Sequence, residues 1–315
     1  MTPFEGTGSP VMQRIRAYFA PVDRAAQHAT IFDPAQSGDF PLDAVPAPWV
    51  DLGWISGFAR TSATAISALR TGAPASVKMQ ARTEVEATVK FAFESWGKLQ
   101  VSLAAGTQQM NLLATQSGAA AAGSGGAAQP AVPLGSGSSA TTLNVGATAQ
   151  FAPGDLVAVD VDYVAGTTGF VGSGVSGAYL KSGLNDVDYI RRVTLNVGTV
   201  QSINSGVLTL SKPLLAGAPV AGMKVSSVLG FCDREGSSFF QEWSALFVGE
   251  GQQGERVIWH YPRLQGMAGI AEVSSKSAGG YESVRLAGSF RAMPVTDPVD
   301  GERVVCFRSY LTRSV

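Results

Sequence analysis

A long alternating segment, Val77 to Phe93, constrains the fold of this chain more than any other feature. Apolar residues occupy the odd positions, with Thr83 as the single interruption, and polar or charged residues occupy most of the even positions. Because side chains on a strand alternate between two faces, this pattern predicts one strand with an apolar face and a charged face. At roughly 3.3 Å per residue the strand would span about 55 Å, whereas strands usually contain about 5–6 residues. Such a strand must bend, or it must belong to a sheet larger than one compact domain supplies.

Composition places the chain among globular proteins without pointing to a charged partner. Its 315 residues suffice for two domains, and the 45% hydrophobic fraction is ordinary. The 15% charged fraction is low, and the net charge of −1 gives no electrostatic argument for binding nucleic acid. Low charge together with 37 glycines suggests either surface buried outside a monomer core or long loops of small residues.

The two cysteines, Cys232 and Cys306, do not form a disulfide framework. Reduced buried thiols are the main interpretation, and a single bridge is the alternative. The N-terminus lacks the layout of a signal peptide, and no apolar run approaches the roughly 18 residues of a membrane span. We therefore expect a soluble protein made in a reducing cytoplasm.

Composition shifts along the chain predict an interrupted domain. Residues 1–48 are rich in proline and are expected to form an N-terminal arm, and residues 115–140 form a Gly/Ala/Ser-rich linker. Residues 141–230 show short apolar runs separated by turn signals, as expected for an inserted small all-β domain. The segments 49–114 and 231–315 together would form one discontinuous β domain, because insertions commonly enter at exposed loops.

Local patterns predict few helices. Helical spacing of Val11, Ile15, Tyr18 and Phe19 predicts one helix within the arm, and a second is expected after Ser95 as N-cap, ending at Gly106. Residues 49–70 are expected to form two strands separated by a glycine-containing loop, followed by a turn at 71–74. Further strands are expected at 141–145, 156–163, 190–193, 197–203, 207–210, 245–248, 255–261, 284–292 and 304–311.

Signals for chemistry are few, so neither an enzyme nor a cofactor is predicted. His28 lies in the polar arm, and His260 is expected to be a packed or subunit-contacting residue. The segment 172–177 matches G-x-G-x-x-G, but no helix signature follows it, which favours a loop over a phosphate site. Two acidic doublets offer oxygen ligands for Ca²⁺, but no loop has the D-x-D-x-D-G spacing, which favours alternating polar positions at strand ends over a metal site. These residues are Asp160, Asp162, Asp186 and Asp188.

Two regions of the chain resemble tail tube proteins of long-tailed bacteriophages. The resemblance covers residues 49–113, from VDLGWISGF to QQMNLL, and residues 231–312, including EWSALFVGEGQQGERVIWHYPRL and MPVTDPVDGERVVCFRSYL. It lies in the order of a strand, a long amphipathic hairpin, a short helix and closing strands. The run at 151–160, F-x-x-G-D-L-V-A-V-D, is similar to β modules that decorate virion proteins.

This resemblance implies a β-sandwich or barrel domain with a long β-hairpin and one short α-helix. It also implies hexameric rings that stack into a hollow tail tube, which conducts double-stranded DNA and surrounds a tape-measure protein during assembly. Partners would be other copies of the chain, the tail terminator and baseplate proteins, with no membrane. The protein would reside in the virion tail after assembly in the bacterial cytoplasm, with the insert as an outward decoration.

A barrel shared by six subunits accounts for the length of the alternating strand, because barrels of 16–18 strands already leave a channel. The polar positions would then face the lumen, and their nearly balanced charge would suit a sliding duplex better than a dense cationic wall. These residues are Lys78, Gln80, Arg82, Glu84, Glu86, Thr88 and Lys90. The alternative is a water-facing outer strand of an ordinary sandwich.

Other functions stay open at this point. The chain could be a tube protein of a contractile injection or secretion system, or another structural or decoration protein of a virion. An enzyme or a carbohydrate-binding module on a β scaffold is the rival from a different class.

Overall fold

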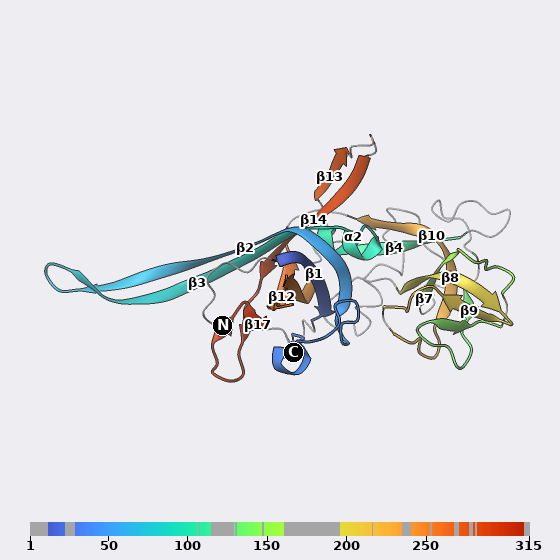
Figure 1. The fold of residues 1–315 in the computed structure, drawn as a ribbon, viewed down its shortest axis with the longest axis horizontal. Coiled ribbons are helices and arrows are strands. Elements are labelled where there is room, and N and C mark those ends of the chain that lie inside the picture. The colour runs from blue at the N-terminus through green and yellow to red at the C-terminus, as the bar shows by residue number, and fades with distance from the viewer. Residues whose placement is uncertain are drawn as a thin grey trace. The chain divides into compact units, whose positions relative to one another are not determined.

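The computed structural model describes residues 12–22, 29–106, 108–114, 129, 131–146, 148–160, 196–215, 217–234, 241–252, 254–267, 271–276, 280 and 282–311. The protein is mainly β, with antiparallel sheets and two short helices in the described residues. The chain divides into unit 1, residues 1–106 and 240–315, and unit 2, residues 107–239. Figure 1 shows the elements of both units.

Unit 1 is built around six strands that close into a ring. They are β1 (Met12–Pro21), β2 (Val50–Thr71), β3 (Ser76–Phe93), β14 (Glu282–Ala292), β12 (Arg256–Gly266) and β11 (Glu242–Gly251). Each pairs antiparallel with the next, and β11 pairs with β1. The ring closes because β14 pairs with β3 along one edge and with the end of β12 along the other. A ring of this size leaves an interior that side chains fill.

Aromatic side chains fill the interior of this barrel. Phe19 contacts Phe247 and Phe290 edge-on, with ring centroids 6.2 and 5.5 Å apart, and Phe91 stacks on Phe290 at 5.5 Å. The odd residues of β3 from Ala87 onward are buried, which is the apolar half of the sequence alternation. The expected long strand is therefore confirmed as β3.

Residues 29–49, which we call the covering segment, pack on the outside of the barrel wall. Three aromatic residues, Phe32, Phe40 and Trp49, pack on Tyr18 of β1 and Leu246 of β11. The alternate residues of β1 and β11 point into the barrel interior. This segment includes α1 (Pro34–Ser37), whose N-cap Asp33 accepts a hydrogen bond from the backbone amide of Ala35 at 2.8 Å. Four consecutive residues of β1, 17–20, are consequently buried.

Two sequence expectations about the N-terminal region are wrong. The helix expected from Val11 to Phe19 is instead strand β1, because the barrel interior and the covering segment bury both of its faces. Residues 12–22 and 29–48 consequently belong to unit 1 and do not form a separate arm.

Residues 50–71 also differ from expectation, because they form the single strand β2 and not two strands with a loop. Gly57 adopts φ +61°, and the register with β3 shifts between Ser56 and Ala59, so one extra residue is absorbed without breaking the pairing. The turn at 71–74 is confirmed.

Helix α2 (Lys98–Ala105) packs against β14 and β12 in unit 1. Gly106 ends it with φ +63°, as predicted. Its N-cap is Gly97 and not Ser95, whose hydroxyl donates to the carbonyl oxygen of Leu52 at 3.2 Å. Four short strands complete unit 1: β13 (Ala271–Lys276), β15 (Val295–Thr296), β16 (Arg303–Val304) and β17 (Phe307–Leu311).

Unit 2 is a separate small β domain with its own core. Its strands are β4 (Gln108–Leu113), β5 (Val132–Pro133), β6 (Thr142–Asn144), β7 (Leu156–Asp160), β8 (Val197–Asn204), β9 (Val207–Leu210) and β10 (Lys224–Arg234). Leu143, Val157, Leu208 and Val225 are fully buried in that core. The strands expected at 197–203 and 207–210 are confirmed as β8 and β9, which pair as a hairpin.

The limits of unit 2 lie outside the insert expected at 141–230. Strand β4 pairs with β10 from Gln108 to Leu113, which draws residues before 114 and after 231 into this unit. Strand β5 lies within the expected 115–140 linker and pairs with β10, so part of that linker also belongs to unit 2. Hydrogen-bonded pairing between distant segments, which composition does not reveal, set these limits.

Candidate functional site: the projecting hairpin

The outer parts of β2 and β3 extend away from the barrel as a two-stranded ribbon (Figure 1). We call residues 61–86 the projecting hairpin, and every residue in it is exposed. A two-stranded hairpin is at best marginally stable in water, because it has no layer on which to bury a face. Both faces of the projecting hairpin therefore lie in solvent.

Large apolar side chains on the projecting hairpin reach solvent. Met79 is 59% exposed and Ile66 58%. The full set is Ile66, Leu69, Val77, Met79 and Val85. Full burial of such a side chain stabilises by about 1.5–3 kcal/mol, so covering them together would provide a substantial driving force for association.

The strand register distributes these apolar residues over both faces of the hairpin. Residues directly opposite each other in an antiparallel pair share a face, and Val85 lies opposite Thr64 while Met79 lies opposite Leu69. From Ala59 to Thr71, β2 contains no extra residue, so even and odd positions of β2 face opposite sides. Val85 therefore shares a face with Ile66, whereas Leu69 and Met79 lie on the other face.

The same register separates the predicted lumen residues into two groups. Between Ala65 and Ile66 the pairing moves from Glu84 to Arg82, so β3 has one extra residue there, Thr83. Glu84 and Glu86 lie opposite odd residues of β2, and Arg82 and Gln80 lie opposite even residues. The predicted set therefore does not keep a single face through Thr83. A second shift, between Leu69 and Arg70, falls at Lys78.

The remaining members of the predicted set lie nearer the barrel. Lys90 is exposed and Thr88 is half-buried, and the Thr88 hydroxyl lies 2.6 Å from that of Thr61. Glu86 forms an ion pair with Arg291 of β14 at 2.8 Å. Their lumen-facing role stays a prediction, because it depends on neighbouring copies.

Both outer edges of the projecting hairpin lack strand partners among the described residues. Strand β2 pairs with β1 only from Val50 to Ile55, and β3 pairs with β14 only from Ala87 to Ala92. Unpaired strand edges expose rows of N–H and C=O groups that can pair with another chain. The hairpin can therefore extend a sheet on either side.

His260, the histidine that the sequence placed mid-strand, is a packed residue of β12. Its Nε2 lies 3.2 Å from the carbonyl oxygen of Thr30, and its ring contacts Trp49 edge-on and stacks on Phe307. Burial lowers the pKa of His260 to about 4. The neutral imidazole thus helps to hold the covering segment on the barrel.

Cys306 lies in a polar cluster with Arg60 and Tyr261. The Arg60 Nε donates to the Tyr261 hydroxyl at 2.9 Å. Burial raises the pKa of the Cys306 thiol, which is free, and burial together with nearby Cys306 raises the pKa of Tyr261 to about 12. Activated nucleophiles need a lowered pKa, so this cluster has the properties of a packed thiol.

The other predicted sites are only partly described. Asp160 ends β7, whereas Asp162, Asp186, Asp188, the 172–177 motif and His28 lie outside the described residues, as does the side chain of Cys232. Within the described part of the chain, no three His, Cys, Asp or Glu side chains converge as metal ligands. No helix in that part is long and apolar enough to span a membrane.

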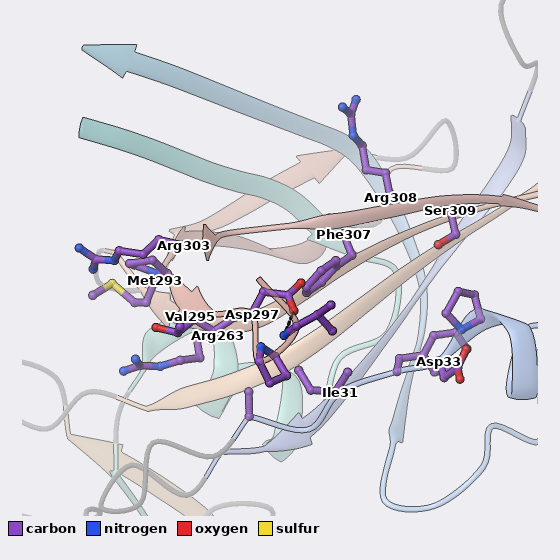
Figure 2. Close-up of a pocket in the computed structure, with 17 residues that line it drawn as sticks. Ile31, Asp33, Arg263, Met293, Val295, Asp297, Arg303, Phe307, Arg308 and Ser309 are labelled. Carbon is purple, nitrogen blue, oxygen red and sulfur yellow. Dashed lines mark hydrogen bonds between the residues drawn. The ribbon is translucent and has the colours of Figure 1, made fainter. Parts of the chain in front are cut away.

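A groove in unit 1 was not anticipated from the sequence. It has a volume of about 1120 Å³ and lies between the covering segment, the β15–β16 loop and β17. Ile31, Val295 and Phe307 line it, as Figure 2 shows. No local pattern could have revealed it, since its walls combine residues 29–34 with residues 293–309 from the other end of the chain.

Comparison with known proteins does not link this geometry to an established group. No protein-family model matches the sequence, and no curated protein matches it significantly.

Proposed function

We propose that this protein is a structural subunit that assembles with copies of itself into a hollow tube, as in the tail of a long-tailed bacteriophage. The observation that carries the proposal is the projecting hairpin, which is exposed throughout and bears uncovered apolar residues on both faces. Its unpaired edges can join neighbouring hairpins into a shared sheet. A surface with these properties fits permanent burial between subunits better than exposure on a monomer.

A ring is the simplest assembly that uses both edges of the hairpin. If the β2 edge of one copy pairs with the β3 edge of the next, the contact is heterologous, and such contacts close into rings or continue as filaments. In the proposed tube, hexameric rings stack, double-stranded DNA passes through the lumen, and the tape-measure protein occupies it during assembly. Tail terminator and baseplate proteins would cap the two ends, and unit 2 would decorate the outside.

Electron microscopy of the purified full-length chain at increasing concentration tests this proposal. We expect hollow tubes or rings of uniform diameter. As a control, Met79→Asp and Val85→Asp together should prevent assembly while leaving the monomer folded, since both side chains are exposed and lie on opposite faces. A wild-type chain that stays monomeric under all assembly conditions would contradict the proposal.

A further inference from the structure

Charge is distributed unevenly along the projecting hairpin. From Thr61 to Thr83 the chain carries Arg70, Lys78 and Arg82 and no acidic residue. Ile66, Leu69, Val77 and Met79 are exposed in this same portion. The end of the hairpin, residues 66–82, is therefore a cationic and apolar surface, which we call the hairpin tip.

The β15–β16 loop of unit 1 has the opposite charge. Residues 297–302 contain Asp297, Asp300 and Glu302 and no basic residue. Val299 within this acidic loop is 91% exposed, which makes it the most exposed large apolar side chain described. The acidic loop therefore combines negative charge with an apolar group that has no cover.

Hydrogen bonds fix the conformation of the acidic loop. The Asp297 carboxylate accepts from the backbone amide of Val299 at 2.9 Å, and the Asp300 carboxylate accepts from that of Glu302 at 2.9 Å. The backbone of Asp297 also bonds with Glu302 and Gly301. A preformed loop loses little conformational freedom on binding, which favours its use as a docking surface.

The groove described above adjoins the acidic loop and offers apolar walls. Val295 and Asp297 lie near Phe307 and Ile31 in Figure 2, while Arg308 points away from them. Arg263 at the same groove is ion-paired with the buried Glu242, and Arg303 and Arg308 also line the groove beside the acidic Asp33 and Asp297. The groove can accept apolar side chains beside the negative loop.

We propose that the hairpin tip of one copy docks on the acidic loop and groove of a second copy. The inference rests on the proposed self-assembly and names a second pair of surfaces that meet in it, besides the two edges of the hairpin. Charge complementarity between the cationic tip and the acidic loop identifies the occupant as another copy of this chain. Because the two surfaces are different, the contact is heterologous and propagates from copy to copy.

Charge reversal in two separate chains tests the pairing of these surfaces. The tip-reversed variant carries Lys78→Glu and Arg82→Glu, and the loop-reversed variant carries Asp300→Lys and Glu302→Lys. Each variant alone should need at least about tenfold more protein to assemble, because like charges then face each other. An equimolar mixture should assemble as readily as wild type, with the two chains alternating, because every contact then joins opposite charges.

The readout is the concentration for half-maximal assembly, measured by light scattering and electron microscopy at one salt concentration. Glu272→Lys, an exposed change on β13, serves as the matched control and should assemble as wild type. Asp300→Asn removes the charge of this side chain but keeps an oxygen that can accept the hydrogen bond from the Glu302 amide. This variant therefore separates loss of charge from loss of loop structure. If wild type assembles but the two reversals do so equally well, or their mixture fails to recover, the docking proposal is wrong. A wild-type chain that does not assemble would instead contradict the proposed function.

Discussion

The two halves of β3 show what one alternating pattern becomes in two environments. From Ala87 to Phe93 the apolar residues enter a closed barrel, where Phe91 is 3% exposed. From Val77 to Val85 the pattern is chemically similar, yet Val85 is 41% exposed and Met79 59%. The halves differ because β14 and the interior of the barrel cover only the first of them.

This difference separates folding from assembly within a single strand. Residues near the barrel contribute to the stability of the monomer, since their apolar surface is removed from water when the chain folds. Residues of the projecting hairpin gain that contribution only when another surface covers them. Substitutions in the two halves should accordingly affect different measurements.

The largest effect should come from truncating the barrel interior. Phe91 stacks on Phe290 and lies 5.4 Å from the Phe247 ring, so Phe91→Ala should lower the free energy of unfolding by about 3–5 kcal/mol. Met79→Ala in the projecting hairpin should change it by less than about 0.5 kcal/mol. Urea denaturation of both variants measures the difference under conditions where wild type is monomeric. Equal losses of stability would contradict the separation of the two halves.

Ion pairs should show the same contrast. Glu242 is 1% exposed and holds both Arg263 and the Gln265 amide, so Arg263→Ala removes a cation from a buried carboxylate and should cost about 3–5 kcal/mol. The Glu86–Arg291 pair is about half exposed, so Arg291→Ala should cost less than about 1 kcal/mol. Thermal unfolding followed by circular dichroism distinguishes these values. A large effect at Arg291 would show that the base of the hairpin is more constrained than its exposure indicates.

Acidification should lower the stability of the barrel through His260. His260 has a pKa of about 4 when folded, against about 6.5 when unfolded, so the unfolded chain binds a proton first as the pH falls. This contribution to stability is fully present above pH 6.5 and is lost as the pH falls to about 4, by about 3 kcal/mol. Unfolding free energies across this window measure it. His260→Phe should remove this component, and an unchanged pH slope in that variant would assign the effect to other groups.

Local sequence patterns predicted the elements whose partners are close in sequence. The alternation of β3, the turn after Thr71 and the glycine that ends α2 each depend on neighbouring residues, and each appears in the structure. The helix expected at 11–19 was wrong because a local pattern does not show whether a strand is buried on both faces. A strand buried on both faces has no alternation, and its apolar residues can mimic helical spacing.

The candidate site was predicted only in part. The sequence identified the hairpin strand and its charged residues, but not the extra residue at Thr83 that moves Arg82 and Gln80 to the other face. Thr83 interrupts the alternation in the sequence, so the sequence did mark the position of this register shift. Its effect depends on the pairing partner, which alternation alone does not specify.

The sequence by itself determined a mainly β chain with one very long amphipathic strand, because side-chain periodicity is a local property of the backbone. Only the tertiary structure decided where this strand is covered, since closure of the barrel joins β14 to β3 and to β12 across long separations in the chain. It also brought the acidic loop next to the groove formed with residues 29–34. Burial and juxtaposition are properties of the folded arrangement, and the hairpin tip is exposed because β1 and β14 pair only with the inner parts of β2 and β3.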